Sequence, residues 1–289
     1  MPLTVTLPDL GERKYKPFPR RLMRTSDGDT PQIEQPIRMV SCDTPEKAHY
    51  AGLPPTAQAT LNKARDRLAS AFYSNHLPGG LREYLAERIT SDAAARHIGA
   101  GNRATAEFER LQQERLTRED GKQRRLAIIP TGEVIDTYGR MLAYIAPYYA
   151  NTASDPLPPS KSDPRRSTFN LNMVASGWAV FFPVYPSLHQ PDDFNRILNA
   201  AELAWQEKRG AWNEFGADLL LAYEFRMCVK LARAASAAQG ISGAFQRTCV
   251  DLRSMKNVGP HGFPSVSPPY RLWIWNKDVA EATQKLALH

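Results

Sequence analysis

The sequence predicts an α+β fold, because strand-type and helix-type residue patterns occur in separate blocks along one chain. Short apolar segments rich in β-branched or aromatic residues are bounded by turn residues, which is typical of strands. The expected strands are 21–26, 32–42, 124–130, 139–146 and 178–186. Longer segments repeat apolar residues at helical spacing. The expected helices are 56–72, 81–116, 170–176, 192–212 and 217–239.

The first two strands are expected to form a hairpin, because the Asp27-Gly28 pair in DGDT favours a reversal of the chain. A loop with two adjacent prolines follows, and Thr56 is expected to open the first helix. One face of that helix is apolar. It carries Leu61, Ala64, Leu68 and Phe72.

The second helical stretch, 81–116, is expected to break near the glycines at 99–101. Arginines and acids nearly balance between 74 and 121, so this segment is interpreted as a solvated helical insertion and not as an arm that follows a phosphate backbone.

The strand pattern then resumes, with Arg140 where the strand 139–146 begins. A loop rich in Pro, Ser and Asp at 151–167 is expected to be exposed. The last expected strand of the body is followed by a helix with Asp192 as its N-cap.

The segment 217–289 is interpreted as a C-terminal extension, with an Ala-rich helix to about 239 and a less regular tail. Trp273 and Trp275 alternate as in a strand. Stacking on bases is one interpretation of the basic and aromatic YRLWIWNK segment, but packing against the body or against a partner subunit is favoured.

The chain has 289 residues and a net charge of +7, which favours a polyanionic partner without naming one. No apolar run is long enough to span a bilayer, and the N-terminus has the wrong order of charge and apolar residues for a secretory signal. We therefore expect a cytoplasmic protein. Three widely spaced cysteines without a CxxC pair favour buried free thiols over disulfides or a zinc site.

Acidic residues near the N-terminus form a candidate metal site. A hairpin can bring Asp29 and Asp43 to one ion, and the carbonyl oxygen of Thr44 would complete an irregular oxygen shell of the kind that calcium accepts. Glu46 would then orient or deprotonate the attacking water. Alternatively, the two aspartates bond only to their own turns, and Glu46 is a surface residue.

Two arginines could hold a phosphate group with bidentate hydrogen bonds. Arg38 precedes Asp43 by five residues and would point to the opposite face of a regular strand, so a bend near Cys42 is required. Arg140 would supply the second guanidinium group and stabilise charge in the transition state. The alternative for Arg140 is an ordinary surface arginine.

Four segments resemble the thermonuclease, or staphylococcal nuclease, family, and they occur in the same order. They are DGDT at 27–30, IRMVSCDTPE at 37–46, DTYGRMLAYI at 136–145 and AAELAWQEKRGAW at 200–212. The resemblance spans roughly residues 20–215. It implies a five-stranded OB-type β-barrel with packed helices, and calcium-dependent hydrolysis of DNA and RNA that leaves 3′-phosphates.

The resemblance also implies roles for individual residues. Asp29 and Asp43 match the calcium carboxylates and Thr44 the carbonyl ligand. Glu46 matches the acid that activates water, and Arg38 and Arg140 match the phosphate-binding arginines. The remaining matches are Asp27 beside the metal and Tyr138 and Tyr185 near the nucleotide.

The expected organisation is a nuclease-like domain at 1–216, with the helical insertion at about 74–121, and a C-terminal extension at 217–289. DNA or RNA is the expected partner, no membrane association is expected, and the extension is a candidate surface for a second copy or a protein partner. The rival function is a non-catalytic nucleic-acid-binding or scaffold module, since related barrels lose their acids and arginines. This chain keeps the acids and the arginines, which favours the nuclease over the rival function.

Overall fold

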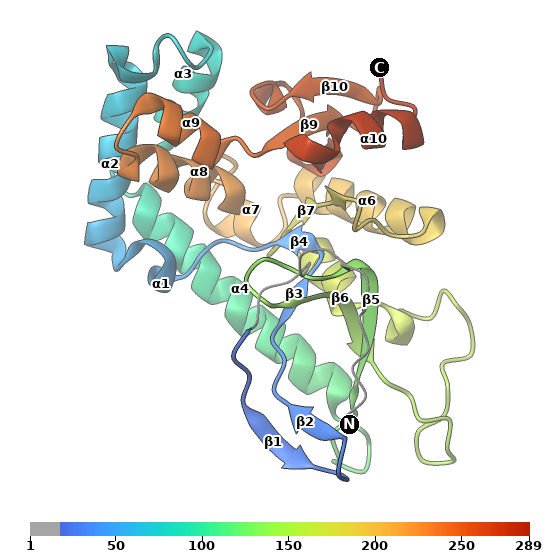
Figure 1. The fold of residues 1–289 in the computed structure, drawn as a ribbon. Coiled ribbons are helices and arrows are strands. Elements are labelled where there is room, and N and C mark those ends of the chain that lie inside the picture. Colours follow the sequence, from blue (N-terminus) through green and yellow to red (C-terminus); the bar gives the residue numbers. More distant parts are fainter. Residues whose placement is uncertain (1–17) are drawn as a thin grey trace, which may run out of the picture.

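The computed structural model describes residues 18–289, apart from the side chain of Glu133, and combines strands with helices (Figure 1). Its strands are β1 Leu22–Thr25, β2 Pro31–Ile33, β3 Ile37–Met39, β4 Ser41–Asp43, β5 Leu126–Ile135, β6 Met141–Pro147, β7 Val180–Phe182, β8 Val184–Tyr185, β9 Arg247–Asp251, β10 Lys256–Gly259 and β11 Arg271–Trp275. Its α-helices are α1 Ala48–Ala51, α2 Pro54–Ala69, α3 Gly79–Arg88, α4 Ala93–Leu116, α5 Phe169–Ala175, α6 Pro191–Gln206, α7 Ala211–Glu214, α8 Ala222–Arg233, α9 Ala237–Ala244 and α10 Val279–Lys285. Short 3-10 helices are η1 Ala71–Tyr73, η2 Pro164–Arg166, η3 Phe263–Ser265, η4 Pro268–Tyr270 and η5 Asn276–Asp278.

The strands between residues 18 and 289 form four separate sheets. β1 pairs with β2, β4 pairs antiparallel with β7, and β6 lies between β3 and β5. The fourth sheet has the order β10-β9-β11-β8. The α+β class is therefore confirmed, whereas none of the sheets in this range closes into the expected five-stranded barrel.

A bend at Ser41 passes the chain from one sheet to another. Ser41 has φ +57°, a left-handed conformation that is uncommon for a residue with a Cβ atom. Before the bend, β3 runs parallel to β6; after it, β4 pairs with β7, with Asp43 opposite Val180. The expected strand 32–42 is thus divided, and the bend that we required near Cys42 is confirmed one residue earlier.

Several helices begin and end at residues that differ from the expected ones. α2 begins at Pro54, two residues before Thr56, because proline is favoured in the first turn of a helix. α6 has Gln190 and not Asp192 as its N-cap, again with a proline next. The break in the expected helix 81–116 lies between α3 and α4. No helix in the described range has both the length and the apolar character needed to cross a membrane.

Gly101 lies inside α4 and allows a close packing contact. A Cβ atom at this position would be 2.6 Å from the carbonyl oxygen of Glu46, closer than real Cβ contacts allow. The expected helix break at this glycine is therefore wrong. The glycine lies inside α4 and lets the helix approach the loop after β4.

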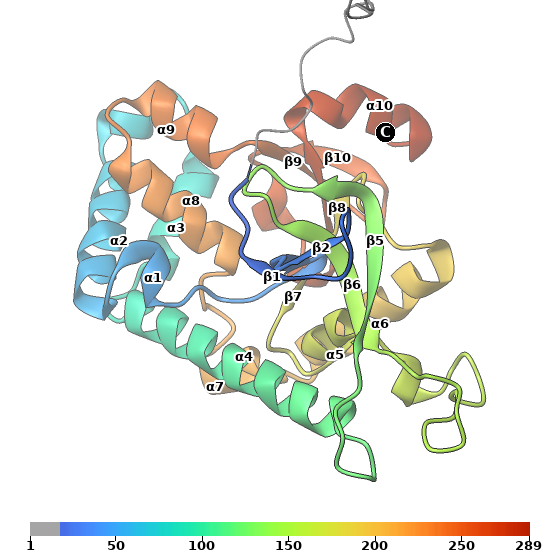
Figure 2. The same cartoon turned by 60° about the horizontal axis from the view of Figure 1, so that its bottom comes forward.

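The segment 217–289 contains more regular structure than expected. After α8 and α9, the strands β9, β10 and β11 occupy much of the predicted irregular tail. β11 pairs antiparallel with β9 on one side and parallel with β8 on the other. The extension therefore completes a sheet that includes a strand from the preceding part of the chain (Figure 2).

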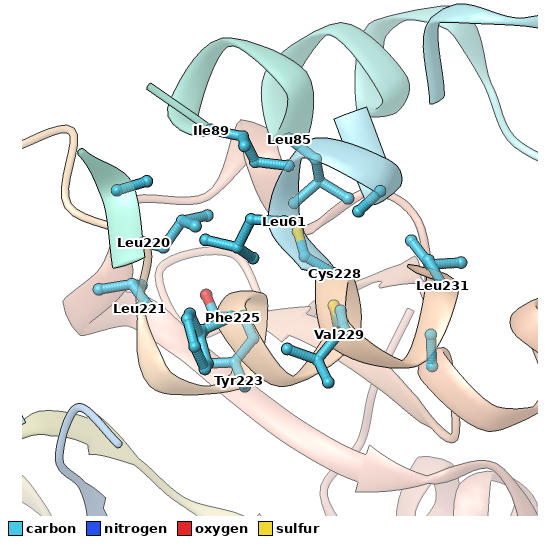
Figure 3. Close-up of a cluster of buried hydrophobic side chains, with 14 of the residues drawn as sticks. Leu61, Leu85, Ile89, Leu220, Leu221, Tyr223, Phe225, Cys228, Val229 and Leu231 are labelled. Carbon is cyan, nitrogen blue, oxygen red and sulfur yellow. The ribbon is translucent and has the colours of Figure 1, made fainter. Parts of the chain in front are cut away.

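The largest hydrophobic core joins the extension to the helices that precede it. Leu61 of α2 and Leu85 of α3 lie against the apolar face of α8, which includes Phe225 and Cys228 (Figure 3). All of these side chains are buried. Since burial of one large apolar side chain contributes roughly 1.5–3 kcal/mol, this contact is a major part of the stability of the fold.

A buried ion pair lies at the edge of this core. Glu224 of α8 and Arg271 of β11 are both almost completely buried, and Nη1 of Arg271 lies 3.2 Å from Oε1 of Glu224. The same oxygen accepts a hydrogen bond from Tyr84 of α3 at 2.8 Å. Arg271 also donates to the hydroxyl of Tyr223 and to the carbonyl oxygen of Val266. The pair thus links α3, α8 and β11.

Candidate functional site

Asp43 is a buried carboxylate at the end of β4, with an exposed fraction of 1%. The bend at Ser41 brings Arg38 to the same side of the strand, and Nη2 of Arg38 lies 2.7 Å from Oδ1 of Asp43. The Arg38 side chain remains 33% exposed. A partly exposed guanidinium group is thus held beside a carboxylate.

Arg226 of α8 is the second partner of Asp43, and it comes from the extension. Its Nη2 lies 2.7 Å from Oδ2 of Asp43, and its Nη1 lies 3.2 Å from Oδ1. The same Nη1 donates to Oε1 of Glu46 at 2.6 Å. Arg38, Asp43, Glu46 and Arg226 therefore form one connected group of charges, which we call the charged cluster.

The electrostatics of the charged cluster favour ionised Asp43. Burial alone would raise the pKa of this carboxyl, but the charges and hydrogen bonds of Arg226 and Arg38 outweigh it and lower the pKa to about 2. Burial by itself would lower the pKa of Arg226, and Asp43 and Glu46 instead raise it. Asp43 and Arg226 therefore both stay charged at neutral pH.

The backbone of Glu46 is fixed by His97, a buried residue of α4. The Glu46 amide donates to Nε2 of His97 at 2.8 Å, and Nδ1 of His97 donates to the carbonyl oxygen of Leu220 at 2.9 Å. These two bonds require a neutral ring with its hydrogen on Nδ1. The ring stacks on Phe225 with centroids 3.9 Å apart. His97 thus connects the loop after β4 to the extension.

This arrangement predicts that the protein loses stability in mild acid. Burial lowers the pKa of His97 to about 3, against about 6.5 for an unfolded chain, so the unfolded state binds more protons as pH falls from 6.5 towards 3. Asp43 adds a loss in the same direction between about pH 4 and its folded value near 2. Half-buried His189, whose pKa is lowered to about 4 by desolvation, also acts in this direction.

Urea unfolding at a series of pH values from 7 to 4 measures this loss. His97→Gln keeps a donor and an acceptor without a titrating ring, so its stability should depend less on pH than that of the wild type. Wild-type stability that stays constant down to pH 4 would contradict the assignment.

Asp27 and Asp29 lie in the turn between β1 and β2, and Figure 1 shows this hairpin tip well away from β4. Oδ1 of Asp29 accepts a hydrogen bond from the Thr30 hydroxyl at 3.0 Å. Hydrogen bonds from Thr30 lower the pKa of Asp27. Both aspartates thus bond within their own turn, while Thr44 directly follows Asp43.

Arg140 lies just before β6 and is engaged in a turn. Its Nη2 and Nε lie 2.7 and 2.8 Å from Oδ2 of Asp136, whose Oδ1 accepts from the amides of Tyr138 and Arg140. Tyr138 is 78% exposed. Tyr185 is buried and donates to Oε1 of Glu281 at 3.0 Å. Of the predicted residues, the charged cluster thus contains Arg38, Asp43 and Glu46.

These donors do not fit a calcium ion as they lie. Both carboxylate oxygens of Asp43 are occupied by guanidinium groups, and Glu46 is bonded to one of the same groups. Between residues 18 and 289 there is no group of three or more His, Cys, Asp or Glu side chains that could hold a metal. The positive charge beside Asp43 and Glu46 is already supplied by the guanidinium group of Arg226.

Comparison with known protein families gives a match to the model described as staphylococcal nuclease homologue, over residues 36–214. This match covers more than half of the 289 residues. The chain belongs to the staphylococcal nuclease homologue family. The predicted resemblance is thereby confirmed. No curated protein matches the chain at the threshold used for relatives.

The family match includes some parts of the predicted site and excludes others. Arg38, Asp43 and Glu46 lie inside it, whereas Asp29 precedes it and Arg226 follows it. Sequence reasoning missed Arg226 and His97, because neither has a motif and each meets Glu46 only through tertiary packing. Arg226 shares its helix face with Lys230 and Arg233, so its spacing was that of an ordinary solvated basic face.

Proposed function

We propose that this chain binds DNA or RNA at the charged cluster and hydrolyses phosphodiester bonds there, leaving 3′-phosphates. The convergence of Arg38, Asp43 and Glu46 carries this proposal. Membership in the staphylococcal nuclease homologue family supports it at the level of reaction class.

Each side chain has a role that its position supports. Arg38 is partly exposed, and among residues 18–289 its only hydrogen-bond partner is Asp43, so its other N–H donors bind the phosphate and stabilise its developing charge. Glu46 takes the proton from the attacking water. Asp43 orients Arg38, and Arg226 and His97 position Glu46.

Calcium dependence is part of what membership in this family leads us to expect. The Asp29, Asp43 and Thr44 set would serve calcium only if Arg226 released Asp43 and the β1–β2 hairpin moved towards β4. The predicted roles of Arg140, Tyr138 and Tyr185 likewise stay proposals.

The remaining expectations belong to the same proposal. The unit 1–216 would carry the chemistry, with residues 74–121 as an insertion and 217–289 as an extension that also offers a surface to a partner. β3 to β7 would be the barrel strands, since the bend at Ser41 passes one strand between two sheets as a barrel requires. A cytoplasmic location is part of this proposal.

The second candidate function is nucleic-acid binding without cleavage. Arg226 favours it, because its bonds to Asp43 and Glu46 reduce the freedom of both carboxylates to bind a metal or accept a proton. The first function includes cleavage, for which Glu46 would be needed. The second function includes binding only.

A cleavage assay tests the proposal. We expect the purified full chain to cut single-stranded DNA or RNA, and we expect Glu46→Gln to slow cleavage by roughly 10²-fold or more, because a general base is lost. Parallel reactions with calcium and with a chelator test the predicted metal dependence. Loss of cleavage on chelation would mean that Arg226 yields its carboxylates to the ion. Binding without cleavage would favour the second candidate.

A further inference from the structure

Arg247 of the extension lies within electrostatic range of the charged cluster and on an aromatic surface. It begins β9 and pairs in register with Trp275 of β11. The guanidinium carbon lies 3.9 Å from the centroid of the Trp275 ring and 5.6 Å from that of Phe182. Phe182 is opposite Ser41 in the β4–β7 pair. The two rings therefore hold Arg247 close to the bend that places Arg38.

The guanidinium group of Arg247 has no anionic partner among residues 18–289. Its Nε is buried without a hydrogen-bond partner, and no described residue forms an ion pair with it. Arg226 and Arg271, two other arginines of the extension, are each bonded to carboxylates. A partly buried cation without a counter-charge is unfavourable, so an unpaired Arg247 indicates that a partner is missing.

The surroundings of Arg247 are positive and would attract an anion. Burial, and then the charges of Arg226 and Arg38, lower the pKa of Arg247 to about 10, although Asp43 acts in the opposite direction. Tyr138 is also within electrostatic range of Arg247. A negative ligand between Arg38 and Arg247 would reduce this repulsion and supply the absent counter-charge.

We propose that Arg247 is a phosphate-binding residue that acts with Arg38 on one phosphate of a nucleic-acid strand. This inference rests on the proposed function and assigns the second arginine of the site to the extension. A phosphate is favoured over a carboxylate because it offers oxygens to two guanidinium forks at once. The exposed ring of Tyr138 nearby can stack on a base.

Arg247 suits this role better than Arg140 in the observed arrangement. The side chain of Arg140 donates from both Nε and Nη2 to Asp136, and its amide is bonded to the same carboxylate. To bind a phosphate, Arg140 would have to leave the carboxylate of Asp136. Arg247 would gain a counter-charge by binding the same phosphate.

The test compares the full chain with Arg247→Met, which keeps much of the apolar length, and with Arg247→Lys, which keeps the charge but not the fork. Arg253→Met is the matched control, since Arg253 belongs to the same extension, is half exposed and pairs with Asp251. Affinity for a single-stranded DNA oligonucleotide and for inorganic phosphate is measured by fluorescence anisotropy and by the ligand-induced rise in melting temperature, respectively.

We expect Arg247→Met to bind the oligonucleotide at least about tenfold more weakly and to lose the phosphate-induced rise. Arg247→Lys should lie between Arg247→Met and the wild type, and Arg253→Met should match the wild type. Without ligand, Arg247→Met should melt at the wild-type temperature or above it, because an unpaired and partly buried cation is removed.

Unchanged affinity in Arg247→Met, or a lower melting temperature with unchanged affinity, would overturn the proposal and leave a purely structural arginine. If Arg247→Met does not fold, the affinity of Arg247→Lys decides. Binding is measured separately from cleavage. If the variants bind more weakly and the wild type never cuts, the proposed hydrolysis is refuted and the phosphate site is supported. If the variants cut and bind normally, the phosphate site is refuted and the proposed hydrolysis is supported.

Discussion

Replacement of Arg38 by alanine should slow cleavage of a single-stranded oligonucleotide by roughly 10²-fold or more, with a milder loss of binding. The guanidinium group is partly exposed and is fixed by Asp43, so it is placed to stabilise charge as the transition state forms. Single-turnover rates at saturating enzyme, together with affinities, separate the two effects. Arg38→Lys keeps the charge without the fork and should be intermediate.

The Arg38 variant should fold, because Asp43 retains Arg226 as a partner. Equal losses in rate and in affinity would contradict a role in the transition state. That result would favour the binding module, in which Arg38 holds the strand and nothing more.

Replacement of Glu224 by alanine should lower the free energy of unfolding by about 3–5 kcal/mol, because it leaves the Arg271 guanidinium buried without its counter-charge. The hydroxyl of Tyr84 also loses its acceptor. Urea unfolding followed by tryptophan fluorescence measures this loss. Glu114→Ala is the control, because Glu114 pairs with Arg110 on the exposed face of α4 and its loss should be too small to resolve.

The shape of the Glu224→Ala transition is also informative. The common core of α2, α3 and α8 leads us to expect that the extension and the preceding helices unfold together. A separate early transition that leaves the rest folded would contradict that expectation and would support 1–216 as an independent unit.

Local chemistry made part of this molecule predictable from its sequence. The Asp-Gly pair placed the hairpin turn between β1 and β2, and the apolar spacing from Leu61 to Leu68 identified the buried face of α2. The opposed directions of Arg38 and Asp43 on a regular strand correctly required the bend at Ser41. In each case the decisive residues are neighbours along the chain.

The rest depended on contacts between distant residues. Arg226 lies 183 positions after Asp43, and no spacing rule links them. β9 and β11 were missed or only partly recognised because their pairing partners stabilise them more than their own pattern does. Arg140 fitted the motif, but Asp136 four residues earlier offered a nearer partner.

The position of β11 between β9 and β8 has a consequence for protein synthesis. β8 and the carboxylates of the charged cluster leave the ribosome well before β11, the strand that lies beside β8. Until translation has passed Trp275, one of the two rings that support Arg247 is missing. The nascent polypeptide thus carries an unfinished site until β11 has been made.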